Sequence, residues 1–109
     1  MSGDVGIVVI RLTGELDLAR RDEIRAALVV GGQEQGILVD LSSVTYADST
    51  VLAELLRFQQ DAGAARIPVA LIVATPQFAR IVNYAGLPDA FAIFADRGAA
   101  LTYLGQQRS

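Results

Sequence analysis

The sequence predicts an α/β domain in which helices cover a single sheet. Short runs of aliphatic and β-branched residues are followed by longer segments with apolar residues at helical spacing. This strand–helix order occurs four times, which is typical of a sheet with at least some parallel neighbours. The 109 residues match the usual size of one domain, so residues 1–109 are predicted to fold as a single unit.

Four apolar runs are the expected strands, and they cover residues 5–12, 37–41, 68–74 and 91–94. The first run is followed by Thr13-Gly14-Glu15, where Gly14 predicts a tight turn. A polar connection over residues 42–46 leads from the second run to a helix. Pro68 stands at the start of the third strand, where proline is tolerated.

Four segments are the expected helices, and they cover residues 18–30, 51–62, 76–84 and 97–104. Each follows a residue whose side chain can accept a hydrogen bond from a free N–H of the first turn, namely Asp17, Asp48, Thr75 and Asp96. Pro76 at the first position of the third helix supports that start. Glycines that follow the first three helices, such as Gly63, predict where they end.

The composition excludes several classes of chemistry. The chain has no cysteine, so disulfides, thiolate metal sites and cysteine nucleophiles are excluded. It has no histidine, so a Ser-His-Asp triad cannot form and the commonest metal ligand is missing. Lysine is absent as well. We therefore expect no enzymatic activity, no cofactor and no metal site.

The charge distribution favours neither nucleic acid nor membrane as a direct partner. The net charge is −3, and the densest basic group, Arg20, Arg21 and Arg25, is interrupted by acidic residues. No apolar run approaches the roughly 20 residues that cross a bilayer, and the N-terminus does not have the pattern of a secretory signal. The simplest interpretation is a soluble cytoplasmic domain.

Asp48-Ser49-Thr50 is the most informative stretch, because it places hydroxyl groups in the first turn of a helix. Free backbone N–H groups at a helix start favour negative charge, so a phosphate on Ser49 would be stabilised there. The structural alternative is that these residues only cap the helix. Asp17 has the same two interpretations. Because strand–helix junctions at the same end of a parallel pair converge, Asp17 is expected near Ser49.

Four short motifs in this order resemble the STAS family, whose founding members are bacterial anti-sigma factor antagonists. The motifs are Leu12-Thr13-Gly14-Glu15-Leu16-Asp17, Leu38-Val39-Asp40-Leu41-Ser42, Tyr46-Ala47-Asp48-Ser49-Thr50 and Ala85-Gly86-Leu87. The resemblance implies a mixed sheet of about four to five strands, with about four helices mostly on one side.

The resemblance also implies a function in partner switching. The unmodified antagonist would bind an anti-sigma factor that is also a GHKL-type serine kinase, and a sigma factor would be released to act in transcription. Phosphorylation would end that binding, and a PP2C-type phosphatase would reverse it. Ser49 matches the phosphoacceptor, with Thr50 as the alternative acceptor. The implied partner-binding residues are Asp17, Asp48, Ser49, Thr50, Val51 and Leu52.

One departure from the family pattern concerns Val51, which stands where the family usually has glycine. We expect the valine side chain to add bulk at the site that a kinase must reach. This favours a second function: STAS domains also serve as accessory subunits of ABC-type lipid transporters and are not phosphorylated there. A third and weaker alternative is an enzyme that holds Mg²⁺ with Asp17, Asp40 and Asp48.

Overall fold

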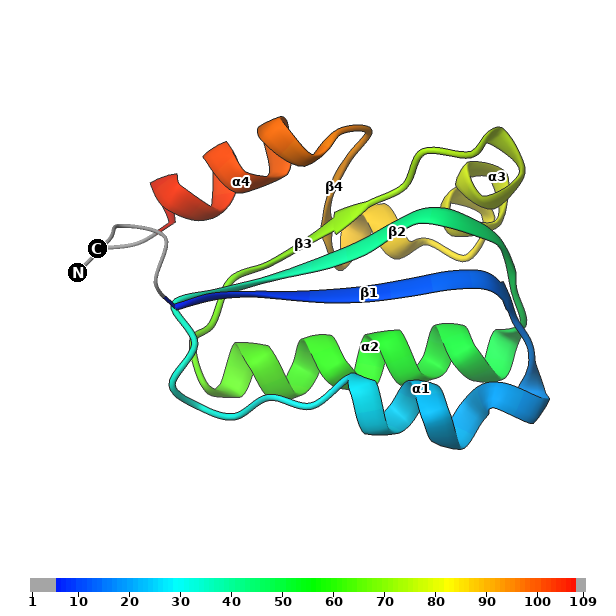
Figure 1. The fold of residues 1–109 in the computed structure, drawn as a ribbon, viewed down its shortest axis with the longest axis horizontal. Coiled ribbons are helices and arrows are strands. Elements are labelled where there is room, and N and C mark those ends of the chain that lie inside the picture. The colour runs from blue at the N-terminus through cyan, green and yellow to red at the C-terminus, as the bar shows by residue number, and fades with distance from the viewer. Residues whose placement is uncertain (1–5, 108–109) are drawn as a thin grey trace.

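The protein forms one four-stranded sheet with helices on both faces, as Figure 1 shows. The structure is a computed structural model that describes residues 6–107. Its strands are β1 (Ile7–Leu16), β2 (Gly36–Ala47), β3 (Val69–Ile72) and β4 (Ala92–Phe94), hydrogen-bonded in the order β1-β2-β3-β4. All three pairings are parallel. The mixed sheet that the resemblance implied is therefore a parallel one over the described residues.

The helices are α1 (Arg21–Ala27), α2 (Ser49–Ala64), α3 (Pro76–Tyr84) and α4 (Arg97–Gln106). Two short 3₁₀ turns, Leu18–Arg20 and Leu87–Asp89, precede α1 and β4. The predicted order of four strand–helix units is confirmed. Residue 5 of the first expected strand lies outside the described residues.

Three helices pack on one face of the sheet and α4 packs on the other, in agreement with the expected arrangement. The larger core joins α1, α2 and α3 to the sheet through residues such as Ile24, Phe58 and Phe78, which are fully buried. The smaller core lies under α4 and consists of Leu38, Ala70, Ile72, Ala100 and Leu104. Because both faces of β3 and of residues 36–41 of β2 are covered, these segments are almost entirely apolar rather than alternating, and Asp40 is the exception.

Strands β1 and β2 extend further than the sequence predicted. Residues 13–15 and 42–46, expected as a turn and a connection, continue the ladder of paired strands. Its register shifts between Arg11 and Thr13 and between Gly14 and Glu15. Gly14 has a φ of +80°, which an L-residue rarely adopts, so it allows an irregularity inside the strand rather than a tight turn. The Arg20 guanidinium donates hydrogen bonds of 2.7 and 3.0 Å to the carbonyls of Thr13 and Glu15.

The helix boundaries agree with the prediction for α3 and, within two residues, for α4. Helix α1 is shorter than predicted and ends at Ala27, and the Asp17 side chain makes no capping hydrogen bond. Helix α2 begins at Ser49 and continues through Gly63 to Ala64, so this glycine does not end it. Its packing against the sheet outweighs the cost of about 1 kcal/mol that glycine brings to a helix interior.

Candidate functional site

The ends of β1 and β2 bring Asp17 and Asp48 to the same end of the sheet. Leu16 pairs with Ala47 across the two parallel strands, and each acidic residue follows directly. The Asp48 N–H donates a 3.2 Å hydrogen bond to the Leu16 carbonyl, which fixes the start of α2 to the end of β1. The expected convergence of the two strand–helix junctions is therefore confirmed.

Asp48 caps α2 and leaves Ser49 free of that role. Its carboxylate accepts a 3.0 Å hydrogen bond from the Val51 N–H, and its carbonyl accepts one of 3.0 Å from the Leu52 N–H. Ser49 is the first residue of the helix, and its side chain is exposed and has no hydrogen-bond partner among the described residues. Thr50 is half-buried. The Ser49 hydroxyl is therefore the more accessible of the two.

Two residues expected to contact a partner are buried. Val51 has no exposed surface, and Leu52 is 8% exposed. Both belong to the larger core, because positions 51 and 52 of α2 face the sheet while position 49 faces solvent. The expectation that Val51 contacts a partner or adds bulk at Ser49 is therefore wrong. Leu52 keeps a narrow exposed strip that lines the groove described next.

An apolar groove of about 450 Å³ begins at Ser49 and runs between α2 and α3, lined by Ser49, Leu52, Arg80, Ile81, Tyr84 and Ala85. Tyr84 is 98% exposed, which is unusual for a large aromatic side chain. The sequence analysis did not assign Arg80, Ile81 and Tyr84 of α3, or Ala85 directly after it, to the candidate site. The signal that points to them is the i,i+4 spacing of Arg80 and Tyr84, which places both on one face of the helix.

Further exposed apolar side chains lie at the same end of the sheet as Ser49. Leu18 follows Asp17 and is 60% exposed, and Tyr46 precedes Asp48 by two residues and is 43% exposed. Asp17 itself is exposed. An exposed acidic residue, a free hydroxyl and several accessible apolar groups therefore occupy one end of the molecule, a composition that suits a protein interface.

A buried carboxylate fixes α1 against α2 beside this end. Glu54 of α2 is 6% exposed, and its oxygens lie 2.9 Å from Arg57 Nε, 3.4 Å from Arg21 Nε and 3.8 Å from Arg25 Nε. The hydrogen bond from Arg57, together with the charges of the neighbouring arginines, outweighs burial and lowers the pKa of Glu54 below its ordinary value. Since Arg21 and Arg25 belong to α1, this cluster helps to place the segment that begins at Asp17.

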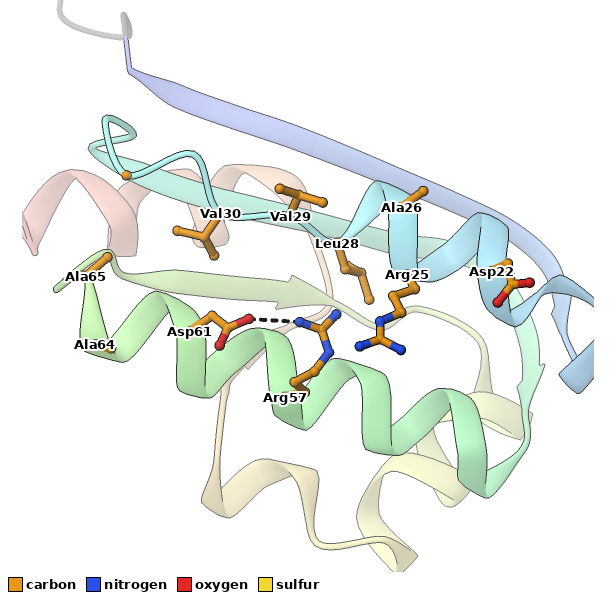
Figure 2. A pocket seen from close by; sticks show the side chains of 11 residues that line it. Asp22, Arg25, Ala26, Leu28, Val29, Val30, Arg57, Asp61, Ala64 and Ala65 are labelled. Atoms are coloured by element: carbon orange, nitrogen blue, oxygen red, sulfur yellow. Dashed lines mark hydrogen bonds and ion pairs between the residues drawn. The ribbon is translucent and has the colours of Figure 1, made fainter.

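A larger groove of about 810 Å³ lies between α1 and α2, away from Ser49. Figure 2 shows the guanidinium groups of Arg25 and Arg57 in the space between the two helices. Their charges are compensated, because both lie near Glu54 and Arg57 also pairs with Asp61 at 2.8 Å. The arginine side chains of this groove therefore offer no uncompensated positive charge to a ligand.

The three carboxylates of the proposed Mg²⁺ enzyme do not form a site. Asp40 lies in β2 on the face covered by α4, 4.0 Å from Arg97 and opposite Arg11 on β1. Burial opposes ionisation of Asp40, but a hydrogen bond from Ser42 and the two arginine charges hold its pKa below the ordinary value. Within residues 6–107, no group of three or more acidic, histidine or cysteine side chains could hold a metal ion.

Comparison with known proteins places this arrangement in a family. A family model described as "Mlab, STAS domain" matches residues 3–94. The chain belongs to the STAS domain family.

Solved structures of other proteins have the same fold at low sequence identity. An anti-sigma factor antagonist from Mycobacterium paratuberculosis matches with a TM-score of 0.83 at 23% identity, over 94% of this chain and 89% of that one. The phosphorylated form of SpoIIAA, a Bacillus cell fate determinant, matches with a TM-score of 0.67 at 22% identity, over 95% and 96% of the two chains. A sulfate transporter family protein from Wolinella succinogenes matches with a TM-score of 0.77 at 17% identity, over 94% and 88%.

Comparison with curated protein sequences returned no match. Over the part of the STAS domain that the structure describes, none of the helices has the length and apolar content needed to cross a membrane.

Proposed function

We propose that this STAS domain is a cytoplasmic anti-sigma factor antagonist, without enzymatic activity of its own, that is switched by phosphorylation of Ser49. In the unmodified form it would bind an anti-sigma factor that is also a GHKL-type serine kinase, and so release a sigma factor. A PP2C-type phosphatase would restore the unmodified form. The observation that carries this proposal is the exposed Ser49 hydroxyl, which the Asp48 cap leaves without a structural task.

The proposed switch acts through charge on a surface that is already formed. A phosphate adds about −1.5 to −2 charges, and the start of α2 offsets part of the cost, so the fold should change little. A partner carboxylate about 6 Å away would be repelled by roughly 3 kcal/mol per unit charge at an effective dielectric constant near 20. That corresponds to a loss of affinity on the order of a hundredfold.

Two substitutions at Ser49 test the switch directly. Ser49→Ala removes the acceptor and should bind the cognate anti-sigma kinase as tightly as the wild type, with or without ATP. Ser49→Asp adds a charge and should bind more weakly, by up to the hundredfold estimated above. The measurement is isothermal titration calorimetry against the kinase. Equal affinity of both variants for the kinase would contradict the charge switch.

A second candidate function is that of an accessory subunit of an ABC-type lipid transporter, which docks on the ATPase without being phosphorylated. The observation that favours it is the description of the matching family model, which names Mlab and not an antagonist. Val51 no longer supports it, because this side chain is buried. Neighbouring permease and ATPase genes, and stable co-purification with that ATPase regardless of Ser49→Asp, would favour this function over switching.

A further inference from the structure

Arg80 is the cationic residue that lines the groove beside the proposed phosphoacceptor. It belongs to α3 and lines the same 450 Å³ groove as Ser49. The other residues that line this groove are Leu52, Ile81, Tyr84 and Ala85, so Arg80 supplies its one charged side chain. An ion pair formed across an apolar surface is stronger than one formed in open water.

Arg80 also differs from most other arginines in having no ion pair. Five arginines of the described residues form salt bridges, namely Arg20, Arg21, Arg25, Arg57 and Arg97. Arg80 forms none within residues 6–107, and helix α3 contains no acidic residue. Its side chain is exposed, so it can change rotamer without disturbing the core.

We propose that Arg80 is the internal counter-ion of phosphorylated Ser49, an inference that rests on the proposed function. The planar guanidinium matches two phosphate oxygens and forms stronger hydrogen bonds with them than neutral donors do. Pairing draws the Arg80 side chain toward Ser49, across the groove that both residues line. Phosphorylation then acts in two ways. It places negative charge at the edge of the groove, and the Arg80 side chain that it attracts covers the exposed parts of Leu52 and Ile81 on which a partner would pack.

The test uses protein in which phosphoserine is incorporated at position 49 during translation, so that no kinase is needed. A phosphoserine has a second pKa near 6, and a paired guanidinium favours the dianion and lowers that pKa. We expect the ³¹P NMR titration of Arg80→Gln to give a higher pKa than the wild type by roughly half a unit, which is about threefold in proton affinity. Arg80→Lys keeps a cation and should fall between the two.

Arg66→Gln is the matched control. Arg66 is also exposed and has no salt bridge within the described residues, but it follows the far end of α2, a helix about 24 Å long at 1.5 Å per residue. Its substitution should leave the phosphate pKa unchanged. The proposal is overturned if Arg80→Gln titrates as the wild type does, or if Arg66→Gln shifts the pKa equally, since the effect would then be one of net charge. Failure of every kinase to modify Ser49 would instead contradict the proposed function. It would not affect the result expected from this titration, which needs no kinase.

Discussion

At the scale of single residues, Asp48 caps α2 and Ser49 presents an exposed hydroxyl, so that two adjacent residues perform these two roles separately. Asp48 satisfies the Val51 N–H and joins α2 to β1, and Ser49 keeps an exposed hydroxyl. A serine that served as the cap would hold its oxygen against the backbone, where a phosphate could not be added without loss of that bond. This division is the physical reason for favouring modification over capping at Ser49.

Replacement of Asp48 by alanine tests whether the cap supports both the stability of α2 and the phosphorylation of Ser49. Asp48→Ala removes the cap and should cost about 1 kcal/mol in the free energy of unfolding, measured by urea denaturation. It should also slow phosphorylation of Ser49, because the first turn of α2 frays. Asp96→Ala is the control: Asp96 caps α4 through a 2.8 Å hydrogen bond from the Ala99 N–H, far along the chain from Ser49. Its stability loss should be similar, with phosphorylation unchanged; equal slowing in both variants would contradict the local role of Asp48.

The sequence predicted the candidate site up to the helix start and no further. Asp17, Asp48 and Ser49 could be placed because strand ends and capping residues are local signals. The sequence could not predict that Ser49 is exposed and Val51 is buried, since this depends on which side of α2 packs against the sheet. The contribution of Arg80 and Tyr84 was also missed, because it requires the packing of α3 beside α2.

At the scale of elements, the irregular end of β1 determines where Asp17 lies. The prediction of a tight turn at Thr13-Gly14-Glu15 was wrong, because a bulge within a strand and a turn use the same residue types. What distinguishes them is the neighbouring strand: β2 continues to Ala47 and keeps β1 paired to its end. The Arg20 guanidinium donates hydrogen bonds to two backbone carbonyls of this irregular segment, and no sequence pattern predicted this contact.

A substitution at Gly14 tests this account of β1. The φ of +80° is strained for any residue with a Cβ, although an added Cβ would meet only the Arg20 guanidinium at 3.7 Å. Gly14→Ala should therefore cost about 1–2 kcal/mol in the free energy of unfolding through backbone strain alone. Chemical denaturation measures this loss. A variant as stable as the wild type would show that the backbone at residue 14 does not have the positive φ.

At the scale of the whole molecule, two buried carboxylates with lowered pKa values couple stability to pH. Glu54 joins α1 to α2, and Asp40 joins β2 to α4 through Arg97. Their folded-state pKa values lie below the ordinary values of 4.5 and 3.8. A lowered pKa means that the folded state binds the proton more weakly than the unfolded state does, so protonation favours unfolding.

The stability of the protein should accordingly be constant near neutral pH and fall in acid. The contribution of Glu54 is fully present above about pH 4.5 and is lost as pH falls through its lowered pKa. Glu54→Gln should be less stable than the wild type at pH 7, because Arg21 and Arg25 lose their carboxylate partner and Arg57 keeps only Asp61. The difference between the two proteins should shrink toward pH 3. Urea unfolding at pH 7, 5 and 3 measures this, and a difference that does not depend on pH would contradict the assignment.

The central claim is that the Ser49 hydroxyl is the acceptor of a regulatory phosphate, and intact-mass measurement tests it most directly. Wild type, Thr50→Ala and Ser49→Ala are incubated with candidate anti-sigma kinases and ATP. One phosphoryl group adds about 80 Da. We predict this shift for wild type and Thr50→Ala with the cognate kinase, and none for Ser49→Ala. The same shift in Ser49→Ala, or its absence from the wild type with every candidate kinase, would contradict the account.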